Sequence, residues 1–263
     1  MSKTGSAAKV KLNSFDDLFG TEQPQTGTEQ VQEIALSELH EFKGHPFKVL
    51  DDEKMQETME SIREHGVLMP GIARPMKDGG YEIIAGHRRR HACELVGLTT
   101  MPMFIRDYTD DEATIIMVDS NIQREDILPS EKAKAYFMKY EAVKHQGKKG
   151  KGNSLDEVGE TAGESAKTVQ RYIYLAHLSD ALLDMVDKKK IGIVQGVELS
   201  FLTEQQQEWV QVVLEETGVI ISTVQASRLK EHGKSDELTL PMVRLILTEP
   251  KPIERKVTIK ADK

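Results

Sequence analysis

The sequence contains very little cysteine, few aromatic residues and no long apolar run. Cys93 is the single cysteine among 263 residues, which excludes an internal disulfide and any zinc finger built on several cysteines. Aromatic residues make up only 5% of the chain, which argues against a large β-sandwich. No apolar stretch approaches the roughly 20 residues that a membrane helix requires, and the first residues lack the apolar core of a signal peptide. We therefore expect a cytoplasmic protein with no membrane segment.

Charge, by contrast, is abundant, and its balance is acidic. Charged residues make up 30% of the chain, hydrophobic residues make up 38%, and the formal net charge is -8 at pH 7. These values fit a mainly helical protein with a small core. An acidic average does not exclude a nucleic-acid partner, because it conceals where the basic residues are concentrated.

Basic residues are concentrated in one stretch, EIIAGHRRRHACELVG, at residues 82–97. A strand that ends at the glycine and runs directly into a helix would leave the first backbone N–H groups of that helix unpaired. The helix dipole and the guanidinium groups of Arg88 and Arg89 would add positive charge there, which is the chemistry of a phosphate site. The alternative is a solvated basic face that pairs with acidic residues such as Glu94 or Asp119.

The pattern on either side of this stretch predicts further strands and helices. An apolar face in residues 51–66 predicts a helix, and TTMPMFIRDY predicts a strand at residues 99–108. Thr109 and Glu112 have the spacing of a capping box, and Pro129 opens another helix. Strands and helices therefore alternate through this half of the chain.

Residues 154–178, SLDEVGETAGESAKTVQRYIYLAHL, predict a helix-turn-helix. Ser154 would cap the first helix, Gly163 would mark the turn, and Ser165 would open the second helix. In such motifs the second helix enters the major groove of DNA with its early residues on base edges. The alternative is an ordinary helical hairpin with a polar face. The candidate DNA-binding residues, which point outward if Val169 is buried, are Ser165, Lys167, Thr168, Gln170, Arg171 and Tyr172.

Three motifs, in this order and at these separations, resemble the nucleotide-pocket motifs of ParB-type (ParB/RepB-like) partition proteins. They are GVLMPGI at residues 66–72, GHRRRHA at residues 86–92 and SNIQRED at residues 120–126. The resemblance runs from about residue 34 to residue 205. It implies an α+β protein, with a small α/β ParB/sulfiredoxin-like N-terminal domain followed by an all-α helix-turn-helix domain.

The expected domain organisation follows from this resemblance and from the composition. Residues 1–33 are rich in polar residues and predict a disordered tail that carries a partner peptide. The nucleotide-binding domain is expected at residues 34–128 and the helical DNA-binding domain at residues 129–218. A C-terminal helical segment at residues 219–263 is a candidate for dimerisation.

The resemblance implies that the first domain binds CTP together with Mg²⁺. Arg88 and Arg89 would hold the triphosphate. Asn121 and Arg124 would close over the phosphates, with Asn121 beside the metal ion. The expected nucleotide-binding residues are Gly66, Met69, Pro70, Ile72, Gly86, His87, Arg88, Arg89, Ser120, Asn121 and Arg124.

Three positions depart from the family pattern. His87 stands where the motif GERRxRA has glutamate, Ser120 where ENLQR has glutamate, and Met69 where GVLQPI has glutamine. An imidazole cannot replace a hard oxygen ligand of Mg²⁺. Phosphate binding is therefore expected, whereas weak CTP hydrolysis and selectivity for the base are left open.

The two ends of the chain carry one short pattern each. SFDDLFG at residues 14–20 is either a peptide that folds against a partner or residual hydrophobicity in a tail. By resemblance the partner would be a ParA-type ATPase. The expected contacts are Lys9, Lys11, Phe15, Leu18 and Phe19. RKVTIKADK at residues 255–263 alternates in polarity and predicts a lone strand.

The resemblance implies a sequence-specific, centromere-binding partition protein. It would be a homodimer that binds a palindromic site in double-stranded DNA, associates with the nucleoid, loads CTP and closes as a clamp. The second hypothesis is a nucleotide-independent helix-turn-helix regulator with a vestigial pocket. A sulfiredoxin-type enzyme is excluded, because Cys93 follows the turn on the helix and does not lie in the turn itself.

Overall fold

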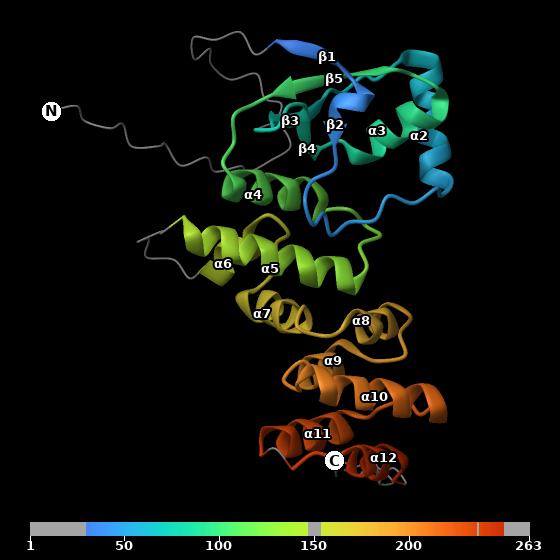
Figure 1. Ribbon diagram of the computed structural model, residues 1–263, viewed down its shortest axis with the longest axis vertical. Coiled ribbons are helices and arrows are strands. Elements are labelled where there is room, and N and C mark those ends of the chain that lie inside the picture. Colours follow the sequence, from blue (N-terminus) through green and yellow to red (C-terminus); the bar gives the residue numbers. More distant parts are fainter. Residues whose placement is uncertain (1–29, 147–153, 236, 250–263) are drawn as a thin grey trace, which may run out of the picture. The chain divides into compact units, whose positions relative to one another are not determined.

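The computed structural model describes residues 30–146, 154–235 and 237–249, and the chain divides after Ile173 into two compact units (Figure 1). The division falls inside the expected DNA-binding segment 129–218. None of the helices in these ranges combines the length and the apolar character that a bilayer span requires. The patterns expected at residues 14–20 and 255–263, with Lys9, Lys11, Phe15, Leu18 and Phe19, lie outside the described residues.

The first unit contains a five-stranded mixed sheet in the order β1-β5-β3-β4-β2. The central strand β3 pairs antiparallel with β4 and parallel with β5, so Ile72 lies opposite both Ala85 and Phe104. Strand β1 begins at Val31, three residues before the expected boundary of the domain. The strands are β1 (Val31–Ala35), β2 (Leu39–His40), β3 (Gly71–Pro75), β4 (Tyr81–Ala85) and β5 (Thr100–Ile105).

The helices of this unit begin and end where their capping residues predict. Asp52 caps α2 by accepting a hydrogen bond from the backbone of Met55 at 2.9 Å. Thr109 and Glu112 form the expected capping box of α4. A short 3-10 helix, η1 (Leu36–Glu38), precedes β2. The α-helices are α2 (Glu53–His65), α3 (His87–Val96), α4 (Asp110–Asn121), α5 (Pro129–His145), α6 (Ser154–Glu160) and α7 (Ala166–Leu175).

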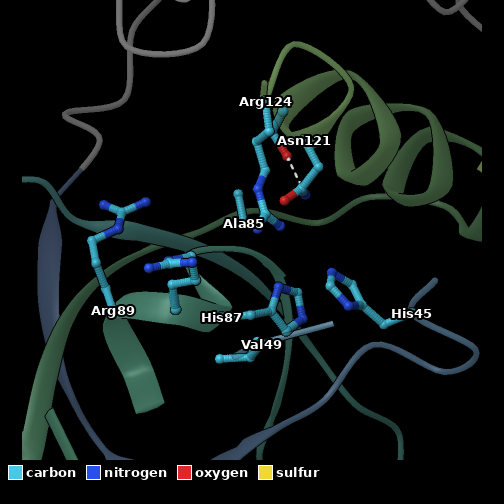
Figure 2. Close-up of a pocket in the computed structure, with 10 residues that line it drawn as sticks. His45, Val49, Ala85, His87, Arg89, Asn121 and Arg124 are labelled. Atoms are coloured by element: carbon cyan, nitrogen blue, oxygen red, sulfur yellow. Dashed lines mark hydrogen bonds between the residues drawn. The ribbon is translucent and has the colours of Figure 1, made fainter. Parts of the chain in front are cut away.

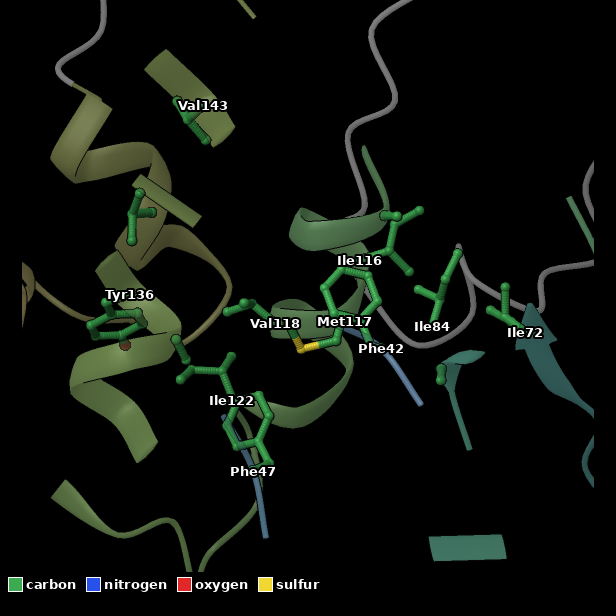
Figure 3. Close-up of a cluster of buried hydrophobic side chains, with 14 of the residues drawn as sticks. Phe42, Phe47, Ile72, Ile84, Ile116, Met117, Val118, Ile122, Tyr136 and Val143 are labelled. Carbon is green, nitrogen blue, oxygen red and sulfur yellow. The ribbon is translucent and has the colours of Figure 1, made fainter. Parts of the chain in front are cut away.

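The sheet separates two apolar cores. Successive residues of a strand point to opposite faces, so Ile83 packs with the residues of α2 and α3, whereas Ile84 packs with those of α4 and α5. The second core, which Figure 3 shows around Tyr136, also buries Val158 of α6 and Val169 of α7. The helix-turn-helix therefore shares its core with the sheet domain, and the division after Ile173 falls near the end of α7.

The second unit is helical throughout its described residues. Buried glutamine side chains hold its turns together: Gln207 donates to the carbonyls of His177 and Leu202, and Gln225 donates to those of Ile246 and Leu247. A mixed sheet followed by helices confirms the expected fold class. The helices are α8 (Asp180–Asp187), α9 (Ile193–Leu199), α10 (Glu204–Thr217), α11 (Thr223–Lys234) and α12 (Leu240–Thr248).

Candidate functional site

The turn between β4 and α3 requires glycine. Gly86 has a φ of 111°, in the left-handed region that favours glycine. A Cβ atom there would lie 3.2 Å from the Cα of Gly71. Helix α3 starts directly at His87, and its first intrahelical bond runs from the backbone N–H of Arg90 to the carbonyl of Gly86. The earlier N–H groups of the helix are thus left for a ligand.

A cavity of about 200 Å³ adjoins this turn. Its wall combines three segments that are far apart in the sequence: residues 45–49, the β4–α3 turn, and the end of α4 with the residues that follow it (Figure 2). Pockets for whole organic ligands usually have volumes of roughly 300–1,000 Å³, so the enclosed part suits phosphate groups. The lining residues are His45, Val49, Ala85, Gly86, His87, Arg88, Arg89, Ser120, Asn121 and Arg124.

Seven of the expected nucleotide-binding residues line this cavity, and four do not. Ile72 is fully buried in the core, where it pairs across the sheet, and Gly66 is the C-cap of α2. Met69 and Pro70 lie beside the site and act through their backbone, because both carbonyls accept hydrogen bonds from Arg89. The expected residues that line the cavity are Gly86, His87, Arg88, Arg89, Ser120, Asn121 and Arg124.

One wall of the cavity comes from residues that no sequence motif indicated. His45 and Val49 belong to a segment without a helical or strand period, so no local pattern singled them out. The structure holds this segment in place, since the backbone N–H of Lys48 donates to the buried carboxylate of Glu131 at 2.8 Å. Ala85, the third missed residue, is the immediate neighbour of the glycine turn.

The basic residues of α3 have different partners. Arg88 donates to Asp52 at 3.1 Å, and this hydrogen bond lowers the pKa of the Asp52 carboxyl. Arg89 donates to backbone carbonyls, and its burial lowers the pKa of its guanidinium. Arg90 pairs with Glu94 at 2.8 Å, as the alternative of a solvated basic face expected. Arg88 and Arg89 line the cavity, whereas Arg90 does not.

Two histidine rings lie against each other in the cavity wall. The ring centroids of His45 and His87 are 3.9 Å apart, and Figure 2 shows them side by side. The Nδ1 atom of His45 donates to the carbonyl of Phe47 at 2.8 Å. Burial, with smaller effects of His45 and Arg90, lowers the pKa of His87 to about 3, and burial also lowers the pKa of His45. Both imidazoles are therefore neutral at pH 7.

The donor set of this cavity does not fit the expected Mg²⁺. Mg²⁺ usually takes one or two carboxylates in addition to substrate phosphates, and none of the ten lining residues carries one. The Asn121 side chain offers one amide oxygen, since its Nδ2 atom donates to Met117 and Ser120. In the described ranges, no group of three or more His, Cys, Asp or Glu side chains could hold a metal ion.

The second candidate site is the helix-turn-helix of α6 and α7. Gly163 in its turn has a φ of 65°. Gly159 allows the turn to approach α6 closely, because a Cβ atom there would lie 2.3 Å from the carbonyl oxygen of Glu164. Val169 and Ile173 are buried, as the pattern predicts. The motif thus has the expected helices, turn and inward face.

Four of the six residues predicted on the outward face of α7 are exposed, and Thr168 and Tyr172 are half-buried. Ser165, Lys167, Gln170 and Arg171 are exposed, whereas Thr168 is half-buried. The Ser165 hydroxyl accepts from the backbone of Thr168 at 3.2 Å and so caps the helix.

Tyr172 is the second half-buried residue on this face. Its ring packs edge-on against Tyr136, with a centroid distance of 6.0 Å. A helix returns to the same face three residues after Val169, so this ring packs against the core while it stays partly exposed.

The segment after α4 contacts both sites within the first unit. Ser120, Asn121 and Arg124 line the cavity. From the same segment, Gln123 Nε2 donates to the carbonyl of Thr161 in the helix-turn-helix at 3.0 Å.

A buried ion pair makes a second connection between α4 and the helix-turn-helix. Asp119 pairs at 2.5 Å with Lys139, whose side chain is 3% exposed. Lys139 Nζ also donates to the carbonyl of Val158 and to the hydroxyl of Thr161, both at 3.3 Å. This pair also shows that Asp119 is not a partner of the α3 arginines. No local pattern in the sequence indicates such long-range bonds.

The chain is similar in sequence to known partition proteins. The family model described as "ParB N-terminal domain" matches residues 20–122. The probable chromosome 1-partitioning protein ParB of Deinococcus radiodurans is 32% identical over 212 residues, which cover 81% of this chain and 70% of that protein. The chromosome-partitioning protein Spo0J of Thermus thermophilus is 30% identical over 235 residues, which cover 89% of this chain and 80% of that protein.

Two solved structures of C-terminally truncated ParB from Caulobacter crescentus also match. The complex with the centromeric parS site has a TM-score of 0.42 at 21% identity and covers 76% of this chain and 98% of that one. The complex with CTP-gamma-S has a TM-score of 0.34 at 22% identity and covers 82% of this chain and 98% of that one. At these scores the superposition is partial, so the assignment to a family rests on sequence identity.

Proposed function

Because the chain belongs to the ParB family of chromosome-partitioning proteins and carries a ParB N-terminal domain, we propose that it is a sequence-specific, centromere-binding protein that works as a CTP-gated dimeric clamp on DNA. The observation that carries this proposal is that an anion cavity and a helix-turn-helix share one compact unit and one apolar core. Nucleotide binding can control DNA binding more directly when both sites belong to the same compact unit.

The cavity would hold the triphosphate of the nucleotide. No side chain caps the first backbone N–H groups of α3, which begins directly after Gly86, and the helix dipole favours negative charge there. Arg88, Arg89 and Arg124 would neutralise the phosphates, and Asn121 would contact them from the end of α4. The choice of CTP rests on the motif resemblance. Since no carboxylate lines the cavity in the described chain, hydrolysis is not part of this proposal.

The exposed face of α7 would enter the major groove. Gln170 would read adenine, and Arg171 would read guanine or contact a phosphate. Ser165, Lys167 and Thr168 would contact phosphates and set the register of the helix. Tyr172 would support this face from behind through its contact with Tyr136.

A homodimer would place two such helices on the two halves of a palindromic site in double-stranded DNA. DNA binding would in turn keep the protein on the nucleoid. Segments at the two ends of the chain are proposed to supply the remaining contacts: residues 219–263 for dimerisation, and Lys9, Lys11, Phe15, Leu18 and Phe19 for a ParA-type ATPase.

One observation favours the second candidate, a nucleotide-independent DNA-binding regulator. Arg88 and Arg89 are already engaged by Asp52 and by backbone carbonyls, as in a pocket that no longer takes a ligand. Calorimetric titration of CTP into the full chain, with ATP, GTP and UTP as controls, separates the two functions. Selective CTP binding supports the clamp. Absence of binding, or equal binding of all four nucleotides, leaves the regulator.

A further inference from the structure

Positive charge is concentrated in the cavity wall near the start of α3. Arg88 and Arg89 come from α3 and Arg124 from the segment after α4. The guanidinium of Arg89 lies above the glycine turn, since a Cβ atom on Gly86 would be 3.4 Å from its Nη2 atom. The N-terminus of α3 adds partial positive charge at the same place. These groups form a cationic wall around the first turn of the helix.

The two histidines contribute hydrogen-bonding atoms without charge. The Nδ1 atom of His45 holds the carbonyl of Phe47, which leaves its Nε2 atom as an acceptor when the ring is neutral. The Nε2 atoms of His45 and His87 are buried and have no hydrogen-bond partner among the described residues. A neutral His87 that carries its proton on Nε2 can donate to a phosphate oxygen.

Carboxylates act on this wall only from outside the cavity. Asp52 is paired with Arg88, and Glu41 affects the pKa of His45 without lining the space. A divalent cation placed here would be close to three guanidinium groups, which repel it. The guanidinium groups themselves can bind phosphate oxygens in bidentate fashion, which is the role that a cation otherwise has.

We propose that this cavity binds the nucleoside triphosphate as the metal-free anion, with Arg88, Arg89 and Arg124 in place of a divalent cation. The inference rests on the proposed function, since it specifies the form in which the nucleotide enters the same site. His87 is the residue that sets this preference, because it places an imidazole at the start of α3, where the family motif has a carboxylate.

The test compares CTP binding with and without a divalent cation. CTP is titrated into the full chain by calorimetry at constant ionic strength, once in excess EDTA and once in excess Mg²⁺. Excess Mg²⁺ complexes CTP and so removes the metal-free anion, and we therefore expect apparent CTP binding to be roughly tenfold or more weaker in Mg²⁺ than in EDTA. Equal affinity in the two buffers, or weaker binding in EDTA, overturns the metal-free form and leaves the proposed function standing. Absence of CTP binding in both buffers overturns the proposed function and this inference with it.

A pair of variants tests the role of His87. His87→Glu places a carboxylate at the cavity and should make CTP binding at least tenfold tighter in Mg²⁺ than in EDTA. His87→Gln, which is neutral like the native imidazole, should bind CTP more weakly in Mg²⁺ than in EDTA, as the wild type does, and thermal melting establishes that each variant is folded. A folded His87→Glu protein that still binds CTP more weakly in Mg²⁺ than in EDTA overturns the assignment. If this variant does not fold, wild type and His87→Gln decide the question.

Discussion

The cavity and α7 are both proposed to bind anionic ligands, but they are built differently. In the cavity, Arg88 and Arg89 are held by other groups of the protein before any ligand arrives, and the neighbouring histidines are neutral. On α7, Lys167 and Arg171 are exposed. A small ligand gains affinity from fixed partners because little side-chain entropy remains to be lost. A DNA duplex supplies a continuous row of phosphates against which exposed side chains become ordered.

The segment from Asp119 to Arg124 contacts both regions. Ser120, Asn121 and Arg124 line the cavity, while Asp119 and Gln123 are bonded to the helix-turn-helix side. One segment thus joins two sites of different chemistry, which fits the proposal that nucleotide binding controls DNA binding.

The largest expected effect is the loss of Arg88 from the cavity. Arg88→Ala removes a charge-assisted contact to phosphate and should weaken CTP binding roughly 100-fold, about 2.7 kcal/mol. Arg90→Ala is the matched control, because the adjacent Arg90 pairs with Glu94 on the helix and does not line the cavity. Calorimetry measures both variants. Equal losses in the two proteins would mean that overall charge, and not the cavity, determines affinity.

The recognition helix should respond differently from the cavity. Arg171→Ala should cost roughly 2 kcal/mol on the cognate DNA site and less on random DNA, because a base contact carries specificity. Lys167→Ala should weaken both kinds of DNA alike and lower the salt dependence by about one counterion. Fluorescence anisotropy over a series of salt concentrations separates the two. If Arg171→Ala weakened both DNAs equally, its assignment as a base contact would be wrong.

Acid should affect the cavity through His87. The pKa of His87 is about 3 in the folded protein and 6.5 as the reference value, so the unfolded chain takes up the proton first. Stability is therefore complete above about pH 6.5 and falls as the pH drops toward 3. Between pH 7 and pH 5.5 this site should remove roughly 1 kcal/mol from the free energy of unfolding. Urea unfolding of wild type and His87→Gln measures the difference, and identical pH dependence would contradict the assigned burial.

The smallest expected effect concerns the bond between the two regions. Gln123→Ala removes the hydrogen bond to Thr161 and should leave the separate affinities for CTP and DNA within about twofold. The factor by which one ligand changes the affinity for the other should fall roughly threefold, about 0.6 kcal/mol. Glu125→Ala is the control, because Glu125 is exposed and directly follows this segment. An unchanged coupling factor in Gln123→Ala would exclude this bond as a link.

Local patterns in the sequence predicted the helices, the glycine turn and the inward face of α7, since caps, glycines and apolar spacing are local properties. They did not predict His45 and Val49 in the cavity wall, because a segment without periodicity carries no such signal. They also did not indicate the burial of Ile72 or the packing of Tyr172, which depend on strand pairing and on the contact with Tyr136. The neutral state of His87 depends on burial by residues distant in the chain, and no motif reports burial.

We propose that the nucleotide converts a DNA-bound dimer into a clamp. The most direct measurement compares retention of the full chain on DNA that carries its binding site, with both ends blocked or with one end open, in the presence and absence of CTP. We predict that CTP makes the protein accumulate on end-blocked DNA and that opening one end releases it. Equal retention on both DNAs with CTP present would contradict the clamp and leave a nucleotide-independent DNA-binding protein.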